Sequence, residues 1–203
     1  MAYTFTQEEG NQFILECHHD AAAVGRKLAS NPALAQAVNP VLGESALGAA
    51  GHMGRADIAE MLLASGAKLE LAAAAMLGRR DVVREALDKD PKLAHSGGAH
   101  NIPLAFHAAL SGEIELMQML WDAGAQAEVK HALLGAVMKN RLPLAAWLLE
   151  HGASKEVETY DGKSPLELAE QMKFSEMAEL LDRNQGRKLP AYIRGIGTAG
   201  PKS

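Results

Sequence analysis

The sequence is poor in aromatic residues and cysteine, and it has no long apolar run. Phe, Trp and Tyr make up 4% of the 203 residues, so the core must be built from Leu, Ala, Met and Val. Cys17 is the only cysteine, which excludes an intrachain disulfide and fits a reducing compartment. The longest apolar run, LAAAAML at 71–77, is far shorter than the ~20 residues that span a bilayer. These absences exclude a disulfide-stabilised scaffold, and they predict that the chain has no membrane-spanning segment.

The chain also lacks the basic excess that is typical of nucleic-acid-binding domains. Lys and Arg total 20 against 25 Asp and Glu, which gives a formal net charge of −5. After Asp182 the chain has basic side chains and no acidic ones, so we expect an acidic body and a basic tail at 187–203. The first residues, MAYTFTQEEG, lack the charged start and apolar run of a signal peptide. We therefore expect a cytoplasmic protein that binds neither nucleic acid nor membranes.

The sequence does contain a fourteen-residue segment that recurs, and this segment is called the phrase below. GRADIAEMLLASGA (54–67), GEIELMQMLWDAGA (112–125) and NRLPLAAWLLEHGA (140–153) align without gaps, and weaker copies begin at 78, 173 and 19. The fourth, fifth and eighth positions after the first residue are apolar in the three strong copies, which is one stripe of an α-helix. The closing Gly suits a helix C-terminus that needs a positive φ. Each phrase therefore predicts a turn followed by a helix.

A second short helix is predicted before most copies of the phrase, in segments that are rich in alanine. Small residues recur in the middle of these segments: Ala49-Ala50, Ala74-Ala75, Ala108-Ala109, Gly135-Ala136 and Ala169. Two helices joined by a tight turn form an αα-hairpin. Because one hairpin cannot bury its own apolar face, we expect a stack of them.

The last unit, DGKSPLELAEQMKFSEMAELL (161–181), resembles the ankyrin repeat, with Asp161-Gly162 as its turn and Ser164-Pro165-Leu166 in place of Thr-Pro-Leu. AAGHMGRADIAEMLLASGA (49–67) is similar to another ankyrin unit. The resemblance covers roughly 12–186. It implies an all-α, ankyrin-like repeat solenoid of about six helix-turn-helix units. The domain is expected at 1–186, with an N-terminal capping unit at about 12–43 and a C-terminal capping unit at about 161–186.

The connecting loops are predicted from the spacing of the repeat starts. These starts, at 19, 54, 78, 112, 140 and 173, are 35, 24, 34, 28 and 33 residues apart, whereas an ankyrin period is about 33. The two short spacings predict trimmed loops after positions 67 and 125. Projecting fingers are expected at 93–103 and 153–164. NPALA (31–35) and DPKLA (90–94) each predict a single helical turn, because Asn or Asp before Pro suits a helix start.

The ankyrin resemblance implies a protein–protein interaction module that binds a protein or peptide through its concave inner-helix surface. Large apolar side chains, many of them Met, stand at the ends of the predicted inner helices, where the family is normally polar. A Met-rich surface adapts to a partner helix or peptide, although the same side chains could instead pack between repeats. The predicted partner-binding residues are Met53, Met76, Leu77, Arg79, Arg80, His107, Leu110, Met138, Lys139 and Met172.

Three of these residues, Met76, Leu110 and Met138, share one register position on successive inner helices. We expect them to form a continuous exposed strip on the concave side of a monomeric protein.

The alternative is an enzyme, or a protein that binds a small ligand or a metal, with a pocket near His18, His19 and His52. ECHHD (16–20) gathers potential ligands, but neighbours along a helix point in different directions. Adjacency alone therefore predicts no site, and we expect no catalytic residue, metal or cofactor. Converging histidine side chains would favour the alternative, whereas scattered histidines would argue against it.

Overall fold

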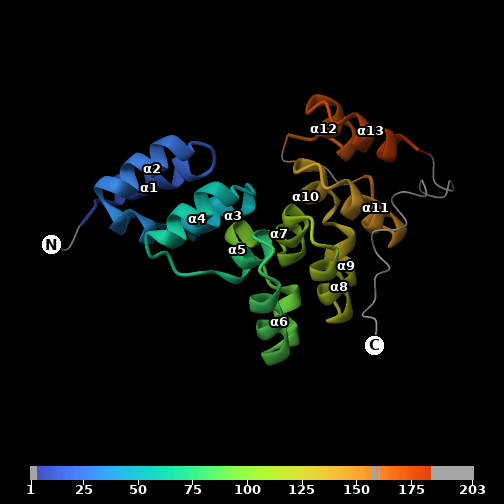
Figure 1. The fold of residues 1–203 in the computed structure, drawn as a ribbon, viewed down its shortest axis with the longest axis horizontal. Coiled ribbons are helices and arrows are strands. Elements are labelled where there is room, and N and C mark those ends of the chain that lie inside the picture. Colours follow the sequence, from blue (N-terminus) through green and yellow to red (C-terminus); the bar gives the residue numbers. More distant parts are fainter. Residues whose placement is uncertain (1–3, 157–158, 160, 184–203) are drawn as a thin grey trace.

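The computed structural model describes residues 4–156, 159 and 161–183, so the predicted basic tail at 187–203 lies outside the described residues. The described part contains thirteen α-helices, three short 3-10 helices and one two-stranded hairpin (Figure 1). The prediction of an all-α fold is confirmed.

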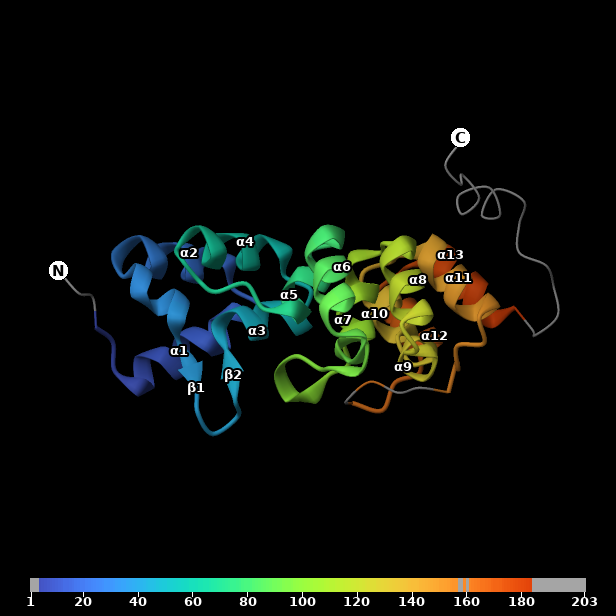
Figure 2. The ribbon, with the colours of Figure 1, turned by 90° about the horizontal axis from the view of Figure 1, so that it is seen from below.

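Twelve of the α-helices form six pairs that lie side by side along the molecule (Figures 1 and 2). The first helices of the pairs, called inner helices here, are α1 (Gln7–Cys17), α3 (Ala46–His52), α5 (Leu71–Met76), α7 (Leu104–Ser111), α10 (Leu133–Met138) and α12 (Pro165–Gln171). The second, outer helices are α2 (Ala21–Ser30), α4 (Ala56–Ala64), α6 (Arg80–Lys89), α8 (Ile114–Asp122), α11 (Leu142–Glu150) and α13 (Ser175–Asp182). Each inner helix contacts the next inner helix, so these six form one continuous layer.

One type of turn joins the two helices in five of the six pairs. Its first residue has a positive φ, at Gly54, Gly78, Gly112, Asn140 and Lys173. In four of these turns the next N–H donates to the carbonyl of an inner-helix alanine: Arg55 to Ala50 (2.9 Å), Arg79 to Ala74 (2.9 Å), Arg141 to Ala136 (2.8 Å) and Phe174 to Ala169 (2.9 Å). These five positions are repeat starts predicted from the sequence. The predicted positions of the turns are therefore confirmed.

The outer helices α4, α8 and α11 also end alike. Gly66, Gly124 and Gly152 have φ values of 93°, 101° and 83°. The alanine after each glycine donates its N–H to a leucine carbonyl: Ala67 to Leu62 (2.9 Å), Ala125 to Leu120 (3.0 Å) and Ala153 to Leu148 (2.9 Å). All three leucine side chains are buried. The glycine therefore lets the chain reverse while the leucine before it stays in the core.

The predicted apolar stripe is wrong in one helix. In α6 the register of the weaker copy that begins at 78 predicts that Val82, Val83 and Ala86 form the apolar stripe. The structure buries Val83 and Leu87, and leaves Val82 38% exposed. Val83 and Leu87 are four residues apart and form a stripe with more apolar area than Val82 and Ala86 do, so the helix presents that face to the core.

The connections follow the predicted spacings. Residues 66–71 make a short turn, and residues 124–130 contain the short helix α9 (Gln126–Lys130) instead of a hairpin. The first finger, which was not among the predicted ones, is the hairpin of β1 (Val38–Asn39) and β2 (Glu44–Ser45), in which Val38 pairs with Ser45. The second finger, residues 97–103, is closed by a bridge between Gly97 and Pro103 and contains the 3-10 helix η3 (Ala99–Asn101). Figure 2 shows both fingers projecting on the same side of the inner helices.

The two predicted single helical turns are present as η1 (Pro32–Gln36) and η2 (Pro91–His95). Asn31 and Asp90 cap them with side-chain oxygens that accept backbone N–H groups, at 3.3 Å and 3.1 Å. The predicted finger at 153–164 is only partly described. There the Thr159 N–H donates to the Lys163 carbonyl at 2.9 Å.

Candidate functional site

The predicted apolar strip does not lie on the surface. Met76 is 4% exposed and Leu110 is 2% exposed, and Met138 is half-buried against the same core. The Lys139 side chain lies against Gly54 beside Leu110, and Arg141 Nε donates to the Leu110 carbonyl at 3.1 Å. The expectation of an exposed strip is therefore wrong for Met76 and Leu110. These positions face neighbouring inner helices, because that is where successive pairs bury their apolar area.

The other predicted binding residues do not form one surface. Arg79 pairs with Glu60 at 2.9 Å, and Arg80 pairs with Glu115, so both arginines link outer helices. His107 is buried, whereas Met172 is 41% exposed at the far end of the stack. Met53, Leu77 and Lys139 are half-buried at the ends of three different inner helices.

A different group of side chains converges on the carboxylate of Glu44. Glu44 lies in β2, at the base of the first finger, and is 2% exposed. Its Oε1 atom lies 3.4 Å from His18 Nε2, 3.4 Å from His52 Nδ1 and 3.0 Å from His100 Nε2. We call His18, Glu44, His52 and His100 the His–Glu centre. The imidazoles of His18 and His100 each make an edge contact with that of His52, with ring centroids 5.0 and 5.3 Å apart.

Two inner helices place His18 and His52. His18 follows the last residue of α1 and His52 is the last residue of α3, and these helices pack side by side. Side chains on a helix lean toward the preceding turn, which brings each imidazole back over its own helix. His18 Nδ1 accordingly lies 2.9 Å from the Ile14 carbonyl, and His52 Nδ1 lies 3.1 Å from the Gly48 carbonyl. The two rings are held by the helices rather than by loops.

The two fingers supply the other members of the centre. Ser45 caps α3 by accepting the Gly48 N–H at 2.8 Å, which positions the preceding Glu44 at the helix entrance. His100 comes from the second finger, where it and Asn101 have φ values of 56° and 57°. Two consecutive residues other than glycine in the left-handed region are uncommon. This bend of the chain turns His100 toward Glu44.

Burial dominates the electrostatics around the centre. It lowers the pKa of His52, although the Glu44 carboxylate partly offsets the effect. It lowers the pKa of His107, on the neighbouring helix α7, to about 4, so this ring is neutral near pH 7. Burial also raises the pKa of the Cys17 thiol to about 12, with the Glu16 and Glu44 carboxylates adding to the rise. Cys17 is therefore a protonated core thiol rather than a reactive nucleophile.

The alternative prediction of a pocket near His18, His19 and His52 is met only in part. The structure brings His18 and His52 together, but His19 is exposed and its backbone carbonyl accepts a hydrogen bond from Arg55. Sequence reasoning missed Glu44 and His100 as members of the site. Glu44 and His100 are separated by 56 residues, and no local motif marks either of them.

Imidazole nitrogens and a carboxylate are the ligand types that bind zinc and related metal ions. One ligand atom each from His18, Glu44 and His52 lies within 4.8 Å of the others. Within the described part of the chain, this is the only trio of His, Cys, Asp or Glu side chains with such a spacing. A hydrogen-bonding partner group could use the same atoms.

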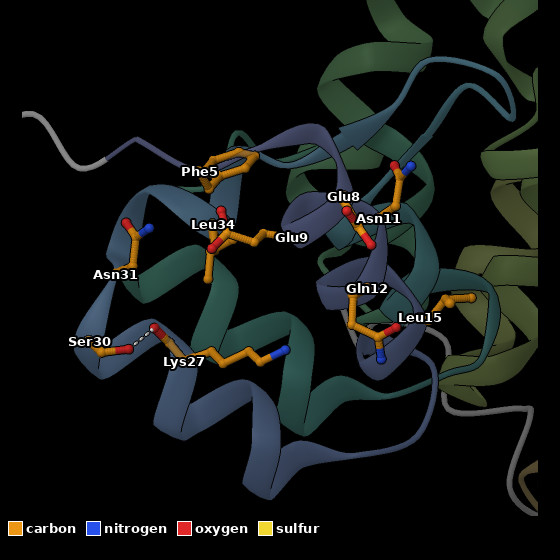
Figure 3. Close-up of a pocket in the computed structure, with 10 residues that line it drawn as sticks. All are labelled: Phe5, Glu8, Glu9, Asn11, Gln12, Leu15, Lys27, Ser30, Asn31 and Leu34. Atoms are coloured by element: carbon orange, nitrogen blue, oxygen red, sulfur yellow. Dashed lines mark hydrogen bonds between the residues drawn. The ribbon is translucent and has the colours of Figure 1, made fainter.

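A separate cavity of about 750 Å³ lies at the N-terminal end of the stack (Figure 3). Its lining residues are Phe5, Glu8, Glu9, Asn11, Gln12, Leu15, Lys27, Ser30, Asn31 and Leu34. The Lys27 ammonium pairs with Glu16 at 2.7 Å. No member of the His–Glu centre lines this cavity, so the two sites are distinct.

Comparisons with known proteins name no family for the chain. No protein-family model matches it, and no curated protein matches its sequence. Among the described residues, no helix is both long enough and apolar enough to cross a membrane.

Proposed function

We propose that the protein is an ankyrin-like binding module that recognises a protein or peptide partner through the face formed by its inner helices and fingers. Support comes from the six stacked helix pairs, the turn that recurs between them and the two fingers on one side. The last unit adds a capping box: Ser164 accepts the Glu167 N–H at 3.3 Å, and the Glu167 carboxylate accepts the Ser164 N–H at 2.8 Å. This is the position of the Ser-Pro-Leu triplet on which the resemblance rests.

The observation that carries the proposal is the location of the His–Glu centre. It occupies the corner where inner helices α1 and α3 meet both fingers. Its core is a buried carboxylate, yet the His100 side chain is 38% exposed, so solvent and a ligand can reach this imidazole. A few convergent polar groups are typical of a binding site. The proposed binding surface is therefore this corner and not the predicted strip of Met76, Leu110 and Met138.

One apolar residue adjoins the end of α3 at this corner. Met53 follows His52 directly and is half-buried. A bound peptide would place a polar side chain on the imidazoles and an apolar one beside Met53. The predicted Arg79, Arg80 and Lys139 are left outside this proposed contact.

Affinity capture with the full chain tests the proposal. The parent protein and the His18→Gln and His100→Gln variants are compared. His131→Gln is the matched control, because His131 is exposed and is not among the histidines that contact Glu44. We expect the parent and the control to retain the same partner, identified by mass spectrometry, and the two variants to lose it. Circular dichroism would confirm that all four proteins are folded. Identical partners for all four would contradict the proposal.

A second candidate is favoured by the convergence of His18 and His52 on Glu44. In this candidate the centre binds a small ligand or an ion directly.

A further inference from the structure

We infer that the His–Glu centre binds one divalent first-row transition-metal ion, zinc in the first place, through His18, Glu44 and His52, with His100 as the fourth ligand. The inference rests on the proposed use of this centre as a binding site, but it requires no protein partner.

The spacing of the donor atoms fits a tetrahedral ion. Zinc with nitrogen and oxygen ligands at their usual bond lengths holds neighbouring ligand atoms about 3.3 Å apart. Glu44 Oε1 lies 3.4, 3.4 and 3.0 Å from nitrogens of His18, His52 and His100. The largest separation within the trio of His18, Glu44 and His52 is no more than 4.8 Å. Side-chain rotations within this trio would close it around an ion. His100 lies outside the trio and would complete the site from its position 3.0 Å from Glu44.

The orientation of His18 favours a cation between its ring and Glu44. His18 Nδ1 lies 2.9 Å from the Ile14 carbonyl, which can only accept, so Nδ1 carries the ring proton. In the neutral imidazole the lone pair of Nε2 then faces the Glu44 oxygen, itself an acceptor, at 3.4 Å. Two acceptors that face each other repel unless a positive charge lies between them. Histidine ligands of metals commonly donate their other N–H to a backbone carbonyl in this way.

His52 differs from His18 in one respect. Its Nδ1 atom lies 3.1 Å from the Gly48 carbonyl and 3.4 Å from Glu44 Oε1, so the same nitrogen faces both oxygens. To bind an ion beside Glu44, Nδ1 must supply the lone pair and the ring proton must lie on Nε2. The backbone carbonyl in α1 thus orients the imidazole of one ligand, His18.

The charge of the centre also favours a cation. Glu44 is almost fully buried, and burying a carboxylate is costly unless it is paired. The basic groups that contact it in the described part of the chain are the three imidazoles, with no Lys or Arg among them. A divalent ion would compensate the carboxylate and bind all three rings. A set of imidazoles and one carboxylate selects zinc, cobalt, nickel or copper over magnesium and calcium.

The test uses the full chain, purified without a histidine tag, stripped with a chelator and dialysed. Zinc is titrated by calorimetry, and cobalt(II) serves as an optical probe. We expect one ion per chain and the intense visible bands of tetrahedral cobalt. Glu44→Gln and His18→Gln should each weaken zinc binding by at least about 100-fold, the upper end of what even an outer-shell change costs. His19→Gln is the matched control, because it removes the neighbouring imidazole outside the centre, and it should bind zinc as the parent does.

Because Glu44 is buried, the Glu44→Gln variant could fail to fold. His18 and His100 are partly exposed, so the variants at these two positions still test the inference. The inference is overturned if the parent binds no stoichiometric zinc, or if His18→Gln and His100→Gln bind zinc as tightly as His19→Gln. Partner capture repeated with chelator separates the two proposals. If the parent binds no metal but captures a partner that His18→Gln does not capture, the metal inference alone is wrong. If the centre binds metal but every variant captures the same partners, the proposed partner binding alone is wrong.

Discussion

Gly98 of the second finger lies directly against the buried imidazole of His107 on α7. A Cβ atom at position 98 would stand 2.9 Å from His107 Nε2, 2.8 Å from Cε1 and 2.7 Å from the Ala72 Cβ. Only glycine lets the finger approach the inner helices this closely. The same approach brings His100, two residues further on, to the Glu44 carboxylate. The contact between Gly98 and His107 therefore helps to assemble the His–Glu centre.

Gly98→Ala should lift the second finger from α5 and α7. We expect a loss of about 1–3 kcal/mol in the free energy of unfolding, the usual cost of overpacking, together with weaker zinc binding. Urea denaturation and calorimetry measure the two effects. Gly43→Asn is the control in the other finger, because a Cβ atom there would meet nothing beyond its chain neighbours within 4 Å, and asparagine tolerates its φ of 64°. Equal stability of Gly98→Ala and the parent would show that the finger does not need this contact.

His107 should make the stability depend on pH. Burial lowers its pKa to about 4 in the folded protein, whereas the unfolded chain has a pKa of about 6.5. Because the folded value is depressed, this stabilisation is complete above about pH 6.5 and is lost as the pH falls toward 4. The free energy of unfolding should drop by about 2–3 kcal/mol from this group between pH 7 and pH 4.5.

The contribution of His107 is isolated with His107→Gln, since other groups titrate in the same range. Urea unfolding of both proteins at pH 7 and pH 4.5 gives the difference. We expect the variant to lose less stability on acidification than the parent does. Equal losses would mean that His107 is not the group responsible.

Met76→Glu should unfold the stack or nearly do so. Met76 lies in the core between inner helices, and a carboxylate there has no partner, so we expect a loss of more than about 3 kcal/mol. Met172→Glu is the matched control at the end of another inner helix. Because Met172 is exposed, its change should stay within about 0.5 kcal/mol. Thermal melts compare the two variants. A small loss of stability in Met76→Glu would contradict the placement of Met76 in the core.

The repeat register could be predicted from the sequence because local physics sets it. The turn at Gly54 and its four counterparts need a positive φ, and the N–H that follows bonds to an inner-helix residue only a few positions back. Leu62, Leu120 and Leu148 are likewise placed by helical periodicity and by the glycine that ends each helix. The trimmed loops follow from chain length alone. Each of these features depends on residues close together in the chain.

The sequence by itself therefore determined the helices, their turns and the loops between them, but it did not determine which way a helix end faces. The sequence predicted that Met76 and Leu110 are exposed, but both are buried because they pack against neighbouring inner helices. The His–Glu centre depends still more on the tertiary structure. His18, Glu44 and His100 lie far apart in the sequence and meet because two fingers fold back over two inner helices. Periodicity reports which side of one helix is apolar, whereas the meeting of side chains from four elements depends on how those elements pack in three dimensions.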